Sequence, residues 1–145
     1  MIIQTVSRKS EIDGFLREVK AILSSESFCI DRDFVFQEIR ANDELEDEFT
    51  NVNTLLALDY CTSDVIDEIK QLTVEDYCES MVDNQKPEFN VFHVFGKRIQ
   101  NRDVYIKVRL KERMSSNDKF VFCISFHFAR YPLTSFPYRR KSSSV

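Results

Sequence analysis

The chain has 145 residues, 43% of them hydrophobic, with 13 Phe but only two Gly and three Pro. This length and composition predict one domain with a substantial core, and no apolar run is long enough to span a membrane. The N-terminus lacks the basic start, apolar stretch and cleavage site of a signal peptide, so we expect a cytoplasmic protein.

The formal net charge of −4 is divided unevenly along the chain. Residues 1–88 carry 8 Lys/Arg and 21 Asp/Glu, whereas residues 89–145 carry 12 Lys/Arg and 3 Asp/Glu. This asymmetry indicates an acidic part and a basic part. The basic part could bind an anion, or the two parts could simply attract each other.

The four cysteines, Cys29, Cys61, Cys78 and Cys123, form no CxxC pair. In a reducing compartment we expect free, mostly buried thiols. Cys123 and His127 come nearest to a metal-ligand spacing, but four residues of a strand would hold them roughly 13 Å apart. We therefore expect no metal and no cofactor.

The first predicted element is an amphipathic helix over Ser10–Leu23, with Ser10 and Asp13 placed as a capping box. Phe28–Ile30 is compatible with a short strand. The segment 31–50 is ambiguous, since FVFQEIR reads as one or two helical turns and NDELEDEFT as an exposed acidic loop or helix.

Between Asn51 and Met81 the pattern predicts a set of short helices. Their predicted caps are Asn51 or Asn53, then Thr62 or Ser63, then Thr73 with Asp76. Residues 81–90 would link the helices to the strands. Two prolines exclude residues 130–140 from a central strand, and residues 139–145 are predicted to be a disordered tail.

Three strand-like runs follow between Phe92 and Ala129. Since alternate side chains of a strand point to opposite faces, one predicted apolar face comprises Val104, Ile106, Val108, Leu110, Phe120, Phe122, Ile124, Phe126 and Phe128. The opposite face would carry Tyr105, Lys107, Arg109, Val121, Cys123, Ser125 and His127. The polar members of this second set are typical of an anion site.

Helices followed by antiparallel strands predict a single α+β domain. In this interpretation residues 1–88 form a mostly helical, acidic part, which packs on a small antiparallel sheet formed by the basic residues 89–129. The other face of the sheet must meet solvent, a ligand or a partner.

The segment LLALDYCTSDVIDEIKQLTVEDYCESM, followed by VFGK, VYIKVRL and ISFHFA, resembles the MqsR-type toxins of bacterial toxin–antitoxin pairs. The resemblance covers roughly residues 54–128, and LTVEDY and VYIK are its most specific pieces. It implies a RelE-like α+β fold and a metal-independent, sequence-selective mRNA endoribonuclease that arrests growth. It also implies a cognate antitoxin, typically with a helix-turn-helix domain, that neutralises the toxin.

The resemblance carries over to individual residues unevenly. The family's catalytic tyrosine matches Tyr105 and the lysine two places later matches Lys107, whereas a catalytic lysine of the last strand falls on His127. Glu79 stands where the family has a lysine, and Val94 stands near the position of a family glutamine. The two last departures leave open whether the active site is intact.

Metal-free RNA cleavage uses the substrate's 2′-hydroxyl as nucleophile and needs a general base, a general acid and cations for the phosphate. Histidine is the natural proton carrier near neutral pH. We therefore expect His127 to act as general acid and Tyr105 to orient or deprotonate the 2′-hydroxyl, with Lys107 completing the catalytic set.

The expected substrate-binding residues are Lys97, Arg109 and Ser125, with the arginine as a bidentate phosphate ligand. Phe95 or Tyr131 could stack on a base.

Each of these features has a simpler interpretation. A Tyr-x-Lys-x-Arg row is often only the wet face of a sheet, His127 could be a hydrogen-bonded structural residue, and for His93 the structural role is favoured. The whole chain could be a non-catalytic RNA-binding or partner-docking module, or a RelE-fold relative that poisons a protein target. The acidic residues 43–48 could lie against the protein's own basic face.

Overall fold

The computed structural model describes residues 2–40, 43–83, 91–113 and 118–140, and these form an α+β fold with a six-stranded mixed sheet and four α-helices. In chain order the elements are β1 (Ile2–Thr5), α1 (Lys9–Leu23), α2 (Ile30–Asp33), β2 (Phe34–Phe36), α3 (Asn51–Leu58), α4 (Thr62–Lys70), the 3₁₀ turn η1 (Val74–Asp76), β3 (Tyr77–Asp83), β4 (Val91–Ile99), β5 (Arg102–Glu112) and β6 (Lys119–Phe128). No helix in these ranges is long and apolar enough to cross a membrane.

The strand order is β1-β3-β4-β5-β6-β2. All neighbouring strands are antiparallel except β2, which runs parallel to β6. The α+β class is therefore confirmed, but the purely antiparallel sheet is wrong. The acidic part carries all four α-helices of the described residues, but it also contributes three of the strands, β1, β2 and β3.

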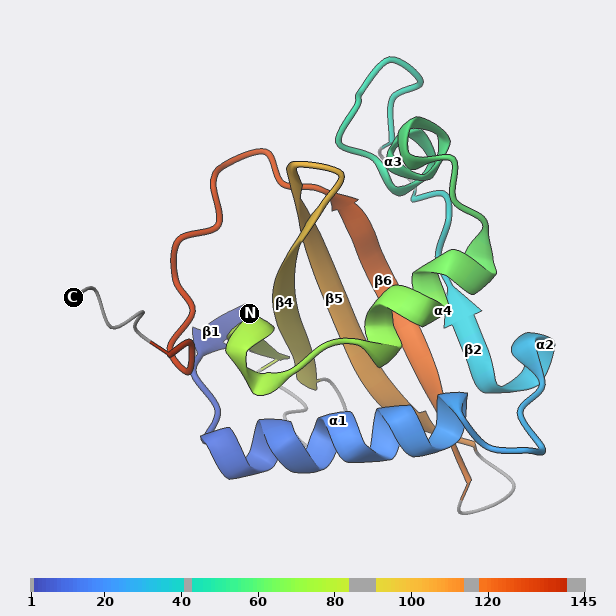
Figure 1. The fold of residues 1–145 in the computed structure, drawn as a ribbon, viewed down its shortest axis with the longest axis vertical. Coiled ribbons are helices and arrows are strands. Elements are labelled where there is room, and N and C mark those ends of the chain that lie inside the picture. The colour runs from blue at the N-terminus through green and yellow to red at the C-terminus, as the bar shows by residue number, and fades with distance from the viewer. Residues whose placement is uncertain (1, 41–42, 84–90, 114–117, 141–145) are drawn as a thin grey trace.

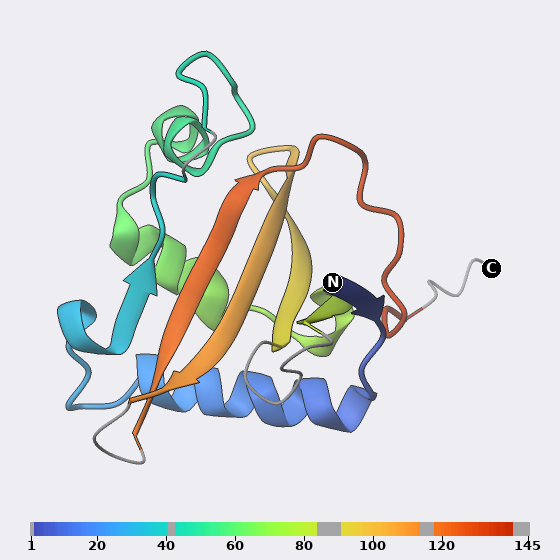
Figure 2. The ribbon, with the colours of Figure 1, turned by 180° about the vertical axis from the view of Figure 1, so that it is seen from behind.

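Helices α1 and α4 lie on the same face of the sheet, and α3 lies beside the end of β6 (Figure 1). Figure 2 shows the molecule from behind, with β4, β5 and β6 in front of these helices. We call this second side of the sheet the open face.

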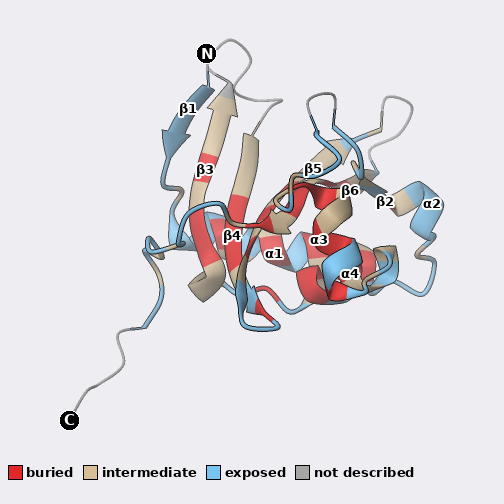
Figure 3. Ribbon diagram, turned by 90° about the horizontal axis from the view of Figure 1, so that it is seen from above, coloured by how far each residue is buried: buried red, intermediate tan, exposed pale blue. Residues whose placement is uncertain are grey.

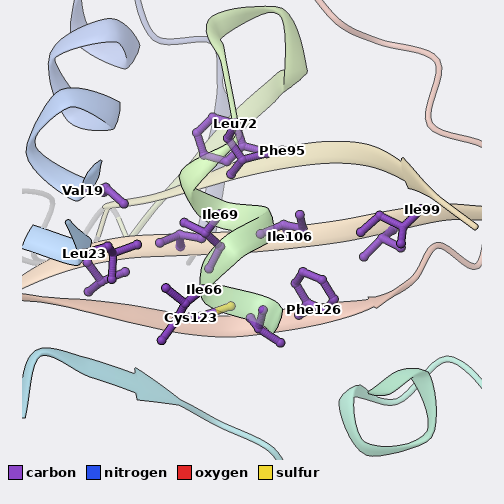
Figure 4. Packing of buried hydrophobic residues seen from close by; sticks show 14 of the residues in the cluster. Val19, Leu23, Ile66, Ile69, Leu72, Phe95, Ile99, Ile106, Cys123 and Phe126 are labelled. Atoms are coloured by element: carbon purple, nitrogen blue, oxygen red, sulfur yellow. The ribbon is translucent and has the colours of Figure 1, made fainter. Parts of the chain in front are cut away.

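The core lies between the sheet and α1 and α4. Val19, Ile66 and Ile69 bring their buried side chains to Ile106 and its strand neighbours (Figure 4). Buried segments of α1, α3, α4 and the central strands appear red in Figure 3, whereas β1 is exposed and α2 has no buried residue. Burial of one helical stripe per helix explains why the 3.6-residue period predicted α1 and α4 correctly.

Two segments have a different secondary structure from the predicted one. Phe28–Ile30 is not a strand; α2 begins at Ile30, and the short strand is Phe34–Phe36 instead. Tyr77–Asp83 is strand β3, not helix, because β1 and β4 satisfy its backbone on both sides. A short segment cannot reveal such tertiary pairing from its own pattern.

The caps agree with the prediction in part. The reciprocal Thr73–Asp76 capping box is confirmed. The cap of α3 is Thr50, whose hydroxyl accepts from the Asn53 amide, and the cap of α4 is Cys61. The predicted caps, Asn51 or Asn53 and Thr62 or Ser63, therefore lie one to three residues too late. α1 has no side-chain cap bond, and the Ser10 capping box is wrong.

The predicted linker and tail overlap only partly with the described residues. Residues 81–83 belong to β3, and residues 84–90 lie outside the described part. The segment 130–140, here called the tail, contains no strand, as its prolines predicted. Arg139 and Arg140 form ion pairs with Asp76 and Glu75, and the rest of the predicted disordered tail lies outside the described residues.

Candidate active site

A β-bulge in β6 decides which side chains share the open face. Lys107 pairs with Ser125, but the next residue of β5, Val108, pairs with Cys123, so Ile124 is an extra residue in β6. Such a bulge reverses the alternation on either side of it. Phe126 and Phe128 are buried as predicted, whereas Val121 and Cys123 are also buried and Phe120 and Phe122 are not. The predicted inward face of β6 is therefore wrong before the bulge.

The alternation of β5 is confirmed. Val104, Ile106 and Val108 are buried on the helix side. The intervening side chains lie on the open face beside those of β6, in the register Tyr105–His127, Lys107–Ser125 and Arg109–Phe122. Cross-strand partners lie side by side on one face, so the structure brings together five of the predicted residues, Tyr105, Lys107, Arg109, Ser125 and His127.

Asn51, the first residue of α3, holds the bulge in place. β2 ends at Phe36, and beyond it the edge of β6 needs another partner. The buried Asn51 amide donates from Nδ2 to the carbonyl oxygens of Gln37 and Ile124, at 2.7 and 3.0 Å, and its Oδ1 accepts from the amide of Phe126 at 3.0 Å. A side chain thus replaces a strand at the edge of β6.

Tyr105 and His127 form a stacked pair, with ring centroids 5.2 Å apart and planes inclined by 16°. The Nδ1 atom of His127 lies 2.9 Å from the carbonyl oxygen of Phe128. Because a carbonyl can only accept, Nδ1 carries the proton and the neutral ring keeps a lone pair on Nε2.

Both rings of the pair are neutral near pH 7. Burial, reinforced by Glu79 and Cys78, raises the pKa of Tyr105 to about 12. Burial also lowers the pKa of His127, against the opposing effect of its bond to Phe128. A neutral imidazole with a free lone pair is a base and a protonated phenol is a donor. These protonation states favour the reverse of the predicted roles.

Lys107 and Arg109 supply positive charge beside the pair. Burial lowers the pKa of each. The Nζ atom of Lys107 and the Cζ atom of Arg109 each lie 5.0 Å from the centre of the Phe92 ring. The charge of Arg40 further lowers the pKa of Lys107 and of His127, so a third cation lies near the site.

The two positions that depart from the resemblance also lie here. The charge of Glu79 raises the pKa of Tyr105 and Lys107. Val94 pairs with both Glu79 and Lys107 and is 1% exposed. A carboxylate and an apolar side chain therefore flank the lysine on its β4 side.

Four other predicted substrate contacts are not available to a ligand at this site. Lys97 lies on the helix-covered face, where its Nζ contacts Glu68 Oε1 at 2.5 Å and Gln71 Oε1 at 2.8 Å. Phe95 is fully buried in the core and Ser125 is 1% exposed. Tyr131 is 79% exposed, beyond the end of β6.

The sequence prediction missed an aromatic cluster on the open face. We call Phe92, Phe120 and Phe122 the phenylalanine patch; the rings of Phe92 and Phe122 meet edge to face at 6.3 Å. Lys111 lies 5.2 Å from the Phe122 ring and Arg113 lies 5.2 Å from the Phe120 ring. Lys111 continues the Tyr-x-Lys-x-Arg alternation and could have been predicted, whereas the patch depends on the bulge.

The tail borders the site on the β4 side. Pro132–Ser135 line a cavity of about 250 Å³ together with Tyr105, Glu79 and Val94. Gly96 allows this approach, since a Cβ there would lie 2.6 Å from Leu133 Cδ1. The Tyr138 hydroxyl then donates to the carbonyl of Ser7, which holds the far end of the tail.

The acidic loop, residues 43–48, borders the site at the end near His127. Asp47 forms an ion pair with Arg130, and Glu48 lies 3.7 Å from Arg102. The charge of His127 contributes to lowering the pKa of Asp47. The loop thus contacts basic residues of the protein itself, as one sequence interpretation proposed, although it does not contact Lys107 or Arg109 through any ion pair among the described residues.

The remaining candidate groups are structural. His93 Nδ1 lies 2.7 Å from the buried Ser80 Oγ, and burial lowers its pKa to about 4, in agreement with the favoured structural role. All four thiols are free, but Cys29 and Cys61 are exposed, so only half of the cysteines are buried as expected. Within the described ranges no three His, Cys, Asp or Glu residues lie close enough to hold a metal ion.

Comparison with known proteins found no matching family model, no matching curated protein and no matching solved structure. Any functional assignment therefore depends on the geometry and chemistry of this site.

Proposed function

We propose that the protein is a metal-independent endoribonuclease, and that the Tyr105–His127 pair on the open face is its active site. One observation carries this proposal: a neutral imidazole base and a protonated phenol are stacked in register, beside partly desolvated cations. Titratable groups that burial and specific neighbours shift away from their usual pKa values are typical of functional sites.

In the proposed reaction Nε2 of His127 accepts the proton of the RNA 2′-hydroxyl. The 2′-oxygen forms a bond to phosphorus, the bond from phosphorus to the 5′-oxygen breaks, and Tyr105 gives its proton to that leaving oxygen. The products are a 2′,3′-cyclic phosphate and a 5′-hydroxyl end. Lys107 and Arg109 stabilise the extra negative charge of the phosphate as the new bond forms. Proton exchange with water then restores the pair.

The proposed biological role follows the resemblance to MqsR-type toxins. The protein would be the toxin of a type II toxin–antitoxin pair, with a RelE-like fold, acting in the cytoplasm on mRNA at preferred short sequences. A cognate antitoxin, with a helix-turn-helix domain, would neutralise it. The matched Tyr105 and Lys107 support this role, whereas Glu79 departs from the family pattern.

The test is incubation of the purified protein with single-stranded RNA in the presence of a chelator, followed by mapping of the new 5′ ends. We expect cleavage at a small set of sites, and a rate about 10²–10⁴-fold lower for His127→Ala and Tyr105→Phe, the usual contribution of a positioned acid or base. Tyr131→Phe, a matched change outside the site, should cleave normally. Intact RNA with folded wild-type protein would overturn the proposal.

A non-catalytic RNA-binding module is the second candidate, and Glu79 beside Lys107 is the observation that favours it, because a carboxylate repels phosphate. This alternative predicts salt-sensitive RNA binding with no cleavage product. Binding and cleavage measured on the same RNA distinguish the two functions.

A further inference from the structure

The phenylalanine patch is unusual for a sheet face that none of the described helices covers. Phe92, Phe120 and Phe122 are only partly buried, although large apolar side chains normally gain free energy by complete burial. The bulge at Ile124 places the two β6 phenylalanines there. The patch therefore needs an explanation beyond core packing.

Cations line the patch on its β5 side. Lys107 and Arg109 approach the Phe92 ring, and Lys111 lies 5.2 Å from Phe122 and 6.0 Å from Phe120. Aromatic rings interleaved with cations along one groove or face are the arrangement that binds single-stranded nucleic acid. The rings stack on bases while the cations bind phosphates.

The patch lies to one side of the proposed reacting pair. From Tyr105 to Lys111 the β5 strand advances by six residue steps, about 20 Å at the usual rise per residue. Within this span Arg109 pairs with Phe122, and Lys111 pairs with Phe120. A strand of RNA with its scissile phosphate at Tyr105 would thus extend over the patch in one direction.

The other direction is unfavourable for a polyanion. Beyond His127 lies the acidic loop, with Asp47 and Glu48 next to the end of the sheet. Like charge there repels phosphate. The charge distribution along the open face is therefore asymmetric about the reacting pair.

We propose that the phenylalanine patch and its cations form a subsite for about two or three unpaired nucleotides on one side only of the scissile bond, a number typical of aromatic sheet platforms. The subsite selects single-stranded RNA, because bases paired in a duplex cannot stack on the rings. Since every base has a stacking face, the subsite contributes affinity and direction, and sequence selectivity arises nearer the pair. The cleavage aspect of this inference depends on the proposed function; the binding aspect does not.

The first test measures binding of a fluorescein-labelled eight-nucleotide RNA of mixed sequence by anisotropy, using the His127→Ala variant so that the RNA stays intact. Loss of one stacked base should weaken binding about tenfold or more in Phe122→Leu and Phe120→Leu, and Lys111→Gln should reduce the salt dependence. Tyr131→Leu, the same kind of change at an exposed site, is the matched control. The same RNA annealed to its complement should bind at least tenfold more weakly.

Equal affinity of folded Phe122→Leu, Phe120→Leu and Tyr131→Leu for the single strand would overturn the inference, even if the wild type cleaves RNA. Conversely, patch-dependent RNA binding without any cleavage would support the subsite and contradict the proposed endoribonuclease activity. Lys111 lies on the surface, so Lys111→Gln should fold even if a phenylalanine variant does not. An unchanged salt dependence of RNA binding in this variant would then also contradict the inference.

The second test uses a nested set of substrates shortened from either end around one mapped cleavage site. Shortening on one side should raise KM about tenfold per lost stacked nucleotide with little change in kcat, and the effect should vanish in Phe122→Leu. Shortening on the other side should change KM less than twofold. A symmetric effect, or an asymmetry that persists in the variant, would contradict a one-sided patch.

Discussion

The two faces of β5 differ in what their burial achieves. On the helix side Val104, Ile106 and Val108 are at most 1% exposed, and burial of such side chains stabilises the fold. On the open face the same strand places Tyr105 and Lys107, whose pKa values are shifted mainly by burial. Desolvating these groups costs free energy. The comparison teaches that burial on the covered face packs apolar side chains, whereas burial on the open face shifts the pKa values of titratable groups, as the proposed active site requires.

Ile106→Ala should have the largest effect and should sharpen this contrast. Ile106 is fully buried between the sheet and the helices, and truncation of such a residue costs about 2–5 kcal/mol of unfolding free energy. Lys107→Ala, the next residue on the open face, should cost less than about 1 kcal/mol, as surface changes do. Urea titration of both variants measures the difference. Similar losses would show that both faces stabilise the fold equally.

The two histidines allow a pH test of the same contrast. His93, on the covered face, has a pKa lowered to about 4 by burial, whereas an unfolded histidine titrates near 6.5. Between these values the unfolded state binds more protons, so stability falls as the pH falls from 6.5 to 4, by about 3 kcal/mol at 1.36 kcal/mol per pKa unit. Thermal unfolding at intervals across this window measures the loss.

The matched variants separate the two residues. His93→Gln should remove most of this pH dependence, whereas His127→Ala should retain most of it and lose the cleavage activity instead. The cleavage rate of the wild type should fall in acid as His127 becomes protonated, because only the neutral ring can accept the 2′ proton. A cleavage rate that rises in acid would contradict the assignment of His127 as base.

The sequence predicted the elements that are specified locally. The apolar period of α1, the alternation of β5 and the Thr73–Asp76 box each depend on nearby residues only, and all three are confirmed. Lys97 could also have been placed correctly, because alternation along β4 puts it on the same face as Phe95. The two-residue period of the strand, and not the charge of the side chain, thus determines which face carries Lys97.

The bulge could not be predicted from the sequence. KFVFCISFHFA is apolar in both alternation phases, so the pattern does not reveal where the phase changes. The change is fixed by Asn51, which lies 73 residues from Ile124 and contacts it through a side chain. The pairing of β2 with β6 and the register of β6 likewise depend on contacts between residues far apart in the sequence. The patch, the most informative part of the open face, therefore became visible only in the structure.

Asn51→Asp tests whether the bulge connects the two faces. The substitution keeps the acceptor for the Phe126 amide but removes the donors to Gln37 and Ile124, and buried carbonyls without partners cost about 1–3 kcal/mol. We expect a loss in this range together with a lower cleavage rate, since Ile124 sets the position of His127. Asn101→Asp, in the exposed turn between β4 and β5, is the control. If a destabilised Asn51→Asp variant kept full cleavage activity, the bulge would not be required for the geometry of the proposed active site.

Asp47→Asn should have the smallest effect, and it tests the charge at the end of the open face. The substitution keeps an oxygen that can accept from the Phe49 amide at the 2.9 Å contact, so the loop should stay folded. It removes the partner of Arg130 and a negative charge that interacts with His127. Two consequences follow from the same lost charge. RNA should bind several-fold more tightly at low salt, since the freed arginine attracts phosphate, and the gain should shrink as salt screens it.

The pKa of His127 should also fall further, because Asp47 no longer stabilises the protonated ring, so the acid limb of the rate profile should move to lower pH. Glu26→Gln, which removes a charge from the turn after α1, controls for net charge. If Asp47→Asn and Glu26→Gln gain RNA affinity equally, the acidic loop acts only through the total charge and the open face has no charge asymmetry of its own.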